Sequence, residues 1–194
     1  LAFVQNYTDM GFFSIILFLL IGTILTMIVQ ASAATMAITL IMCANGWISL
    51  ELGAALVLGE NIGTTITANL AALTANTQAK RAALAHFVFN VFGVIWVLIV
   101  FHPFMELVNW VVDTFFQSNN PEVAISYKLS AFHSIFNICN VCILIWAVKL
   151  IERTVCALIH PKEEDEEPRL RFITGGMLST CLLYTSPSPR DRTR

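Results

Sequence analysis

Three long stretches of the chain contain no Asp, Glu, Lys or Arg, and each is long enough to cross a lipid bilayer. They cover residues 10–29, 82–101 and 129–148. About 20 apolar residues in a helix span the hydrocarbon core, and a helix satisfies its backbone hydrogen bonds without help from lipid. The whole chain is 57% hydrophobic and 12% charged, whereas roughly a quarter of the residues of a soluble domain are charged. The sequence therefore predicts an all-α integral membrane protein that crosses a membrane several times.

Two short polar segments interrupt the apolar sequence between the first and second stretches. They are residues 30–35 (Gln-Ala-Ser-Ala-Ala-Thr) and residues 60–65 (Glu-Asn-Ile-Gly-Thr-Thr). Amide and hydroxyl groups are costly in lipid unless they meet one another, water or a solute. Secondary transporters commonly bind solutes where broken helices end near the middle of the bilayer. We therefore expect broken or re-entrant helices here, with both breaks forming one solute site.

The residues around these breaks predict half-length helices. Residues 31–50 are uncharged but contain the turn signal Asn45-Gly46, which indicates a short helix followed by a return. Residues 62–77 are rich in Ala and Thr, which let helices approach closely in lipid. We expect this second half-helix to begin within the polar segment, so that its first residues are Gly63, Thr64 and Thr65.

The later charge-free stretches share the pattern His-x-x-Phe-Asn. It occurs once as His86 with Asn90 and once as His133 with Asn137. Residues four apart lie on one face of a helix. These side chains either bond across a helix interface or line a transport route, and the sequence leaves both alternatives open.

Basic residues indicate the orientation of the chain in the membrane. Lys80 and Arg81 precede the second stretch, and Lys149 follows the third. Because basic residues favour the cytoplasmic side, we expect both clusters there and residues 104–121 outside. Polar residues three or four apart within residues 104–117 predict an amphipathic helix in the membrane interface.

Three motifs in this order resemble the bacterial branch of the sodium-dependent phosphate cotransporter (type II Na/Pi) family. They are residues 30–35, residues 59–65 (Gly-Glu-Asn-Ile-Gly-Thr-Thr), and residues 80–86 (Lys-Arg-Ala-Ala-Leu-Ala-His) followed by Asn90. The resemblance covers residues 26–171 and implies the second of two inverted repeats of a secondary transporter, with the first repeat missing. It implies sodium-coupled transport of inorganic phosphate, with sodium as coupling ion and no other cofactor.

One motif departs from the family pattern. The family usually has Gln-Ser-Ser-Ser where this chain has Gln30, Ala31, Ser32 and Ala33. Two hydroxyls are therefore absent, and each ordinary hydrogen bond contributes about 0.5–1.5 kcal/mol. The departure bears on the coupling ion more than on the fold.

The family resemblance and the absence of Lys and Arg from both breaks suggest how the solutes are held. An anion there needs helix N-terminal N–H groups and co-bound cations. We expect Gly63, Thr64 and Thr65 to open a half-helix that binds phosphate. Oxygen ligands for a hard cation such as sodium are expected from the remaining polar side chains: Gln30, Ser32, Thr35 and Asn61.

Two alternatives stand beside these roles. Ser and Thr in membrane helices commonly donate to the carbonyl four residues back, which would make their hydroxyls structural. Glu60 is either a helix cap or a cation ligand, and the sequence does not separate these possibilities.

Composition and resemblance together divide the chain into three parts. Residues 1–160 are predicted to form the transmembrane repeat. Residues 161–180 contain an acidic run and are predicted to be a cytosolic linker towards a missing PhoU-like helical domain. Residues 181–194, rich in Ser, Pro and Arg, resemble translated adapter sequence and are expected to be a non-native tail.

Several function classes are disfavoured. The sequence has no basic stripe for nucleic acid, and it has neither a catalytic triad nor a metal-ligand cluster, so we expect no enzyme. The Cys139-x-x-Cys142 pair lies within an apolar stretch and is expected to pack like small hydrophobic residues. The expected partners are phosphate, sodium and the bilayer. The alternatives are a channel, or a non-transporting membrane anchor or sensor for a cytosolic phosphate-regulatory domain.

Overall fold

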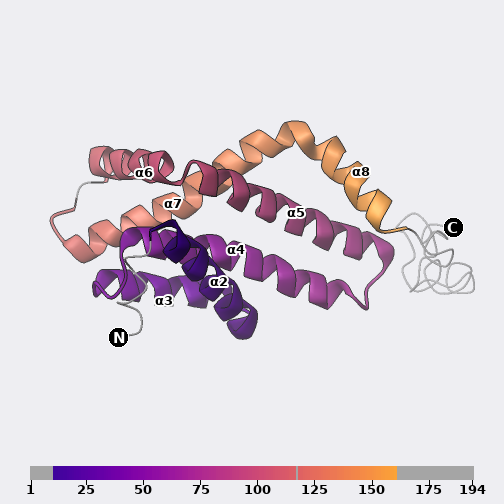
Figure 1. The fold of residues 1–194 in the computed structure, drawn as a ribbon, viewed down its shortest axis with the longest axis horizontal. Coiled ribbons are helices and arrows are strands. Elements are labelled where there is room, and N and C mark those ends of the chain that lie inside the picture. The colour runs from indigo at the N-terminus through magenta and orange to yellow at the C-terminus, as the bar shows by residue number, and fades with distance from the viewer. Residues whose placement is uncertain (1–10, 117, 161–194) are drawn as a thin grey trace, which may run out of the picture. The chain divides into compact units, whose positions relative to one another are not determined.

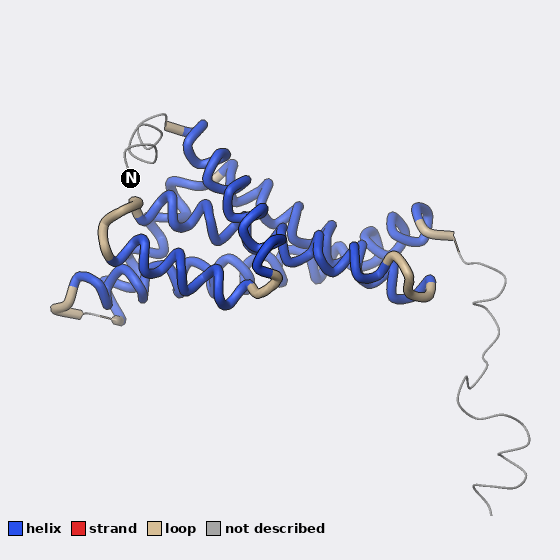
Figure 2. Tube along the Cα trace, turned by 90° about the horizontal axis from the view of Figure 1, so that it is seen from below, coloured by secondary structure: helices blue, strands red, loops and turns tan. Residues whose placement is uncertain are grey.

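The computed structural model of the chain describes residues 11–116 and 118–160, and every regular element within them is helical (Figure 1). The predicted linker and tail lie outside these residues, as does Gln117 of the predicted amphipathic helix. The elements are α2 (Phe12–Val29), α3 (Ser32–Ala44), α4 (Leu50–Ala72), α5 (Thr77–Ile99), α6 (Phe101–Phe115), α7 (Pro121–Leu144), the 3-10 helix η1 (Ile145–Ala147) and α8 (Val148–Leu158). Short loops join them (Figure 2). The all-helical prediction is confirmed.

Three helical stretches are long and apolar enough to cross a membrane: α2, α5 and the stretch Pro121–Leu158. They correspond to the three charge-free stretches of the sequence. The helices α5 and α7 begin upstream of those stretches because an Asn side chain caps each one. Asn76 accepts a hydrogen bond from the backbone N–H of Ala79 at 2.9 Å, and Asn120 accepts one from Glu122 at 3.0 Å.

The first polar segment does break the chain between two helices. α2 ends at Val29, and Gln30 adopts the left-handed conformation, with φ of 56°, which is a common way for a helix to end. α3 then starts at Ser32 and runs for only 13 residues. The predicted half-length helix is therefore confirmed, and a turn at Gly46, with φ of 69°, follows it.

The predicted break at residues 60–65 is wrong. α4 runs without interruption from Leu50 to Ala72, so residues 60–65 lie in its interior (Figure 1). The hydroxyl of Thr64 donates to the backbone carbonyl of Glu60 at 2.8 Å, which lets a polar side chain sit in a continuous helix. Gly63, Thr64 and Thr65 consequently do not open a half-helix.

α2 and α4 cross in close contact because α4 presents glycine where they meet. A Cβ atom at Gly59 would collide with the backbone oxygen of Leu19, and one at Gly63 would lie 2.6 Å from the backbone oxygen of Thr23. Close backbone approach through small residues is a common way for helices to associate in lipid. The contact buries the side of α4 that carries Gly59 and Gly63 against α2.

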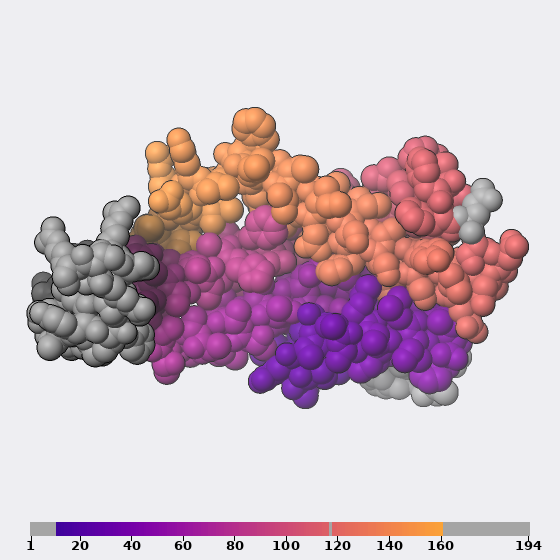
Figure 3. Space-filling view, turned by 180° about the vertical axis from the view of Figure 1, so that it is seen from behind, coloured from indigo at the N-terminus to yellow at the C-terminus, as the bar shows by residue number. Residues whose placement is uncertain are grey.

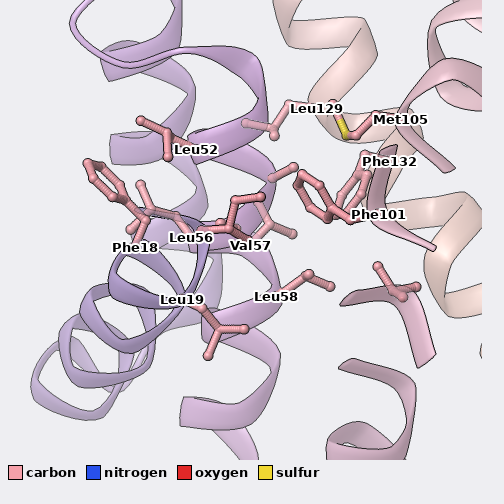
Figure 4. Close-up of a cluster of buried hydrophobic side chains, with 14 of the residues drawn as sticks. Phe18, Leu19, Leu52, Leu56, Val57, Leu58, Phe101, Met105, Leu129 and Phe132 are labelled. Carbon is pink, nitrogen blue, oxygen red and sulfur yellow. The ribbon is translucent and has the colours of Figure 1, made fainter. Parts of the chain in front are cut away.

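Apolar side chains of α2, α4, α6 and α7 form the core beside this crossing (Figure 4). Phe18 and Leu56 lie on its α2 side, whereas Phe101, Met105 and Phe132 fill the other side. α6 buries an apolar face that includes Phe104, Met105 and Val108, and its opposite face is exposed. The amphipathic helix predicted for residues 104–117 is therefore confirmed for residues 104–115. The rear surface shows α7 lying against the helices of the N-terminal half (Figure 3).

A buried amide, Asn140, and a half-buried guanidinium, Arg81, make hydrogen bonds between helices that are far apart in the sequence. Asn140 of α7 donates to the backbone carbonyl of Phe89 at 3.1 Å and accepts from the indole N–H of Trp96 at 3.2 Å, both on α5. Arg81, at the start of α5, donates twice to the backbone carbonyl of Ile159, at 2.9 and 3.0 Å. These contacts fix α5 against α7 and against the end of α8.

The Cys-x-x-Cys pair forms no disulfide. Cys139 is half-buried and packs against the core, as expected, whereas Cys142 is exposed on the outer side of α7.

Candidate functional site

A cavity of about 350 Å³ lies between α3, α4, α5 and α7. Most of the side chains around it are polar, although these helices bury mainly apolar residues elsewhere. Its lining consists of Ser32, Ala33 and Met36 of α3, Glu60, Asn61 and Thr64 of α4, His86, Phe89 and Asn90 of α5, and His133 and Asn137 of α7. Polar groups gathered in a cavity between membrane helices indicate a solute site or a solute pathway.

The cavity brings together most of the polar residues that the sequence singled out. Both His-x-x-Phe-Asn motifs reach it, as do residues of both polar segments. The predicted site residues that line the cavity are Ser32, Asn61, Thr64, His86, Asn90, His133 and Asn137. One site formed by two breaks was expected, and the geometry instead combines one break with a polar face of a continuous helix.

Four predicted site residues lie outside the lining. Thr35 and Thr65 are fully buried and donate to carbonyls of their own helices, at 3.3 and 2.7 Å. Gly63 faces α2, in the region where the two helix backbones are in close contact. Gln30 is exposed at the junction of α2 and α3.

The two His-x-x-Phe-Asn motifs have the same local geometry. The amide nitrogen of Asn90 donates to the carbonyl of His86 at 3.0 Å, and that of Asn137 donates to the carbonyl of His133 at 2.8 Å. Each Asn therefore bonds within its own helix, one turn from its His. Both motifs line the cavity, which lies between helices. Their side chains are therefore placed both at a helix interface and on a possible transport route.

Asn61 and His133 connect α4 to α7 across the cavity. His133 Nε2 lies 3.4 Å from Asn61 Oδ1. The other polar atom of the same amide, Asn61 Nδ2, is buried and has no hydrogen-bond partner among the described residues. A buried donor without a partner is uncommon in a folded protein, and here it belongs to a residue that lines the cavity.

The helix N-terminus at this cavity belongs to α3. Ser32 and Ala33, the first two residues of α3, are part of the lining. The first N–H groups of a helix have no carbonyl partner within it and carry a partial positive charge. The beginning of α3 therefore offers the anion-binding geometry that the sequence had suggested for Gly63.

Glu60 supplies the carboxyl group of the cavity. The sequence left it as either a helix cap or a cation ligand, and its position in the interior of α4 excludes the helix cap. Glu60 is only 4% exposed, and Thr39 Oγ1 of α3 lies 2.9 Å from its Oε1. No Lys or Arg is among the residues that line the cavity. Met36 and Phe89, the apolar parts of the wall, were not identified from the sequence, because isolated apolar residues in a membrane helix carry no signal of a site.

Comparisons with known proteins identify the same family that the sequence motifs resemble. The family model described as Na+/Pi-cotransporter matches residues 4–113. The protein YqeW of Bacillus subtilis (strain 168), named as uncharacterized, is 35% identical over 144 residues, which is 74% of this chain and 44% of that protein.

Two further relatives carry names that mention phosphate. Sodium-dependent phosphate transport protein 2C of Rattus norvegicus is 40% identical over 94 residues, 46% of this chain and 16% of that protein. YjbB of Escherichia coli (strain K12), named as a candidate inorganic phosphate export protein, is 26% identical over 181 residues, 93% of this chain and 32% of that protein. This chain thus spans less than half the length of these relatives. No solved structure matches it.

Proposed function

The chain belongs to the Na+/Pi-cotransporter family, and we propose that its cavity binds inorganic phosphate together with sodium. The activity is sodium-coupled transport of phosphate across the cytoplasmic membrane. The observation that carries this proposal is Asn61 Nδ2, a buried hydrogen-bond donor without a partner at a polar cavity. A bound anion would supply the missing acceptor.

Phosphate binding in this proposal rests on groups that donate hydrogen bonds. Asn61 Nδ2 lies on one side of the cavity, and the backbone N–H groups of Ser32 and Ala33 lie at the start of α3 on another. N–H groups at a helix N-terminus bind anions without a basic side chain. The absence of Lys and Arg from the lining is compatible with this arrangement, because a co-bound cation can offset the remaining negative charge.

Sodium binding rests on oxygen atoms that accept hydrogen bonds. The single hydroxyl proton of Thr64 is donated to the carbonyl of Glu60 at 2.8 Å, so Thr64 presents lone pairs rather than a proton to a ligand. We therefore assign Thr64 and Ser32 to the cation and Asn61 to the anion, the reverse of the sequence-based division for Thr64 and Asn61. Gln30 stays a predicted ligand at the junction before α3.

Coupling between the two solutes follows from their charges. Sodium and phosphate in one cavity each lower the electrostatic cost of binding the other, and this effect is reciprocal. Cotransport needs such a link because neither ion should cross alone.

Two threonines of α4 provide a matched test. Thr64 and Thr67 both donate to carbonyls of α4, at 2.8 and 2.9 Å, but only Thr64 lines the cavity. We expect Thr64→Val to raise the sodium concentration for half-maximal phosphate uptake several-fold, and Thr67→Val to leave it unchanged. The measurement is radiolabelled phosphate uptake by cells that express the full-length protein. Sodium is replaced stepwise by potassium, and protein abundance is determined in parallel. Equal sodium dependence in all three proteins would remove Thr64 from the site, and uptake without any sodium dependence would refute the proposed coupling.

The direction of transport has a second candidate. The similarity to YjbB covers 93% of this chain, and the name of that protein refers to phosphate export. Cells preloaded with labelled phosphate distinguish the two directions. Faster efflux in cells with the protein than in cells without it identifies an exporter, and faster uptake identifies an importer.

A further inference from the structure

Glu60 lies in a position that is hard to reconcile with a permanent negative charge. Its side chain is 4% exposed, and it belongs to the lining of the proposed phosphate cavity. The ion pair in the described part of the chain joins Lys128 and Asp113, which belong to other helices, at 3.0 Å. Glu60 is therefore a buried carboxyl group with no described cation beside it.

The hydrogen bonds around Thr39 indicate where a proton is needed. Thr39 Oγ1 lies 2.9 Å from Glu60 Oε1 and 3.1 Å from the backbone carbonyl oxygen of Thr35. A hydroxyl carries one proton, so it can donate to only one of these two oxygens. With Glu60 ionised, one of the two close oxygen pairs has no hydrogen between its atoms. With Glu60 protonated, its carboxyl donates to Thr39 and Thr39 donates to Thr35, which satisfies both contacts.

The proposed ligand strengthens the same conclusion. Phosphate carries negative charge, and the cavity places it beside the buried Glu60 carboxyl group. Like charges at close range in such surroundings repel strongly, and protonation of the carboxyl group removes the repulsion.

We propose that Glu60 is a proton-binding site of this cavity, and that a proton on its carboxyl group accompanies the bound anion. The inference rests on the proposed function, because the anion is the phosphate assigned there. The proton comes from solution, forms an O–H bond on the carboxyl group, and returns to solution when the anion leaves. Anion and proton then raise each other's affinity by the same factor.

Other titratable groups face the same space and must be separated from Glu60. They are His86 of α5 and His133 of α7. Neither α2 nor the part of α3 that lines the cavity brings a titratable side chain to it. Phosphate itself also changes charge near neutral pH. A comparison between variants therefore decides the matter, because the histidines and phosphate are common to all of them.

The experiment measures binding of inorganic phosphate to the full-length protein at saturating sodium between pH 5.5 and 8.5. Glu60→Gln retains the shape and can donate to Thr39, so it mimics the protonated carboxyl group permanently. At each pH, the phosphate dissociation constant of the wild type is divided by that of Glu60→Gln. We expect this ratio to rise by about tenfold per pH unit in the range where Glu60 is ionised in the phosphate-free protein. Glu51→Gln, at an exposed position in the first turn of α4, is the matched control and should follow the wild type.

A second readout does not depend on how well the Gln variant folds. Infrared spectroscopy of the wild type should show the C=O stretch of a protonated carboxyl group when phosphate is bound, and Glu60→Asp should retain such a band at a shifted position. The proton site is refuted if the ratio of dissociation constants stays constant with pH, or if the phosphate-bound wild type lacks the C=O band of a protonated carboxyl group. Either result leaves the proposed phosphate binding intact. Failure of the wild type to bind phosphate at every pH refutes the proposed function, and the proton inference falls with it.

Discussion

His133 Nε2 of α7 lies 3.4 Å from Asn61 Oδ1 of α4, although 72 residues separate the two in the sequence. The contact brings a His-x-x-Phe-Asn motif to the polar segment of α4 and orients the Asn61 amide. Its Nδ2 atom is then the one left without a partner. One atom of the Asn61 amide therefore contacts another helix, and the other is available to the proposed ligand.

Replacement of Asn61 by Ala should weaken phosphate binding. The lost interaction is a hydrogen bond to a charged ligand, which contributes about 1.5–3 kcal/mol, so the half-saturating phosphate concentration should rise about tenfold or more. The measurement is phosphate uptake at saturating sodium, corrected for the amount of protein in the membrane.

Asn69 of the same helix is the matched control. Its amide donates to the carbonyls of Thr65 and Ala83, at 2.8 and 2.9 Å, and joins α4 to α5 away from the cavity. Asn69→Ala should lower the melting temperature and leave half-saturation unchanged. The assignment of Asn61 fails if both substitutions reduce abundance and neither alters half-saturation.

Gly63→Ala tests whether this glycine packs helices or binds the anion. The added Cβ would lie 2.6 Å from the carbonyl oxygen of Thr23, and overpacking of this kind costs about 1–3 kcal/mol. We expect less folded protein and a lower melting temperature, with unchanged half-saturation for phosphate in the protein that remains. A rise in half-saturation without any loss of stability would restore the role predicted from the sequence.

Arg81 should hold the end of α8 in place. Its guanidinium donates twice to the carbonyl of Ile159, and Lys cannot reproduce this planar fork. Both Arg81→Lys and Arg81→Gln should increase backbone hydrogen exchange in α8, Gln more than Lys. Lys80→Gln removes a neighbouring charge with no such contact described and serves as the control. Equal exchange in α8 for all four proteins would show that the contact contributes nothing measurable.

The orientation of the chain stays a prediction from its basic residues. Lys80 and Lys149 are expected in the cytoplasm and the exposed Asn119 outside. In a cysteine-free background, Asn119→Cys should react with an impermeant thiol reagent in intact cells, and Lys149→Cys should react only after permeabilisation. The reverse pattern would invert the assigned topology.

The sequence was informative wherever one physical signal dominated. Absence of charge over the length of a bilayer identified the three helical stretches that are long and apolar enough to cross a membrane, and Asn45 with Gly46 marked the end of α3 correctly. Polar residues three or four apart likewise indicated the amphipathic character of α6.

The break wrongly predicted in α4 shows that the polar composition of a segment does not by itself predict its structure. A polar composition alone cannot distinguish an interrupted helix from a polar face on a continuous one. Glu60 and Thr64 are four residues apart and therefore share a helix face, which was the available clue. Close contact with α2 through Gly59 and Gly63 depends on a partner helix, and no local pattern specifies which helix that is.

The members of the candidate site were predicted better than their arrangement. Most of the site residues predicted from the sequence do meet at one cavity. Their division into donors and acceptors depends on which hydrogen bonds each helix already makes, as for Thr64, and the sequence does not contain that information. For the same reason the sequence left two roles open for Glu60, and its contact with Thr39 of α3 was not predicted.

Equilibrium binding of phosphate to the purified full-length protein, with sodium varied at constant ionic strength, tests the central claim most directly. The account predicts that sodium lowers the dissociation constant for phosphate, and that phosphate lowers the dissociation constant for sodium by the same factor. Asn61→Ala should weaken phosphate binding at every sodium concentration. A phosphate dissociation constant that is identical in sodium and in potassium would contradict the account.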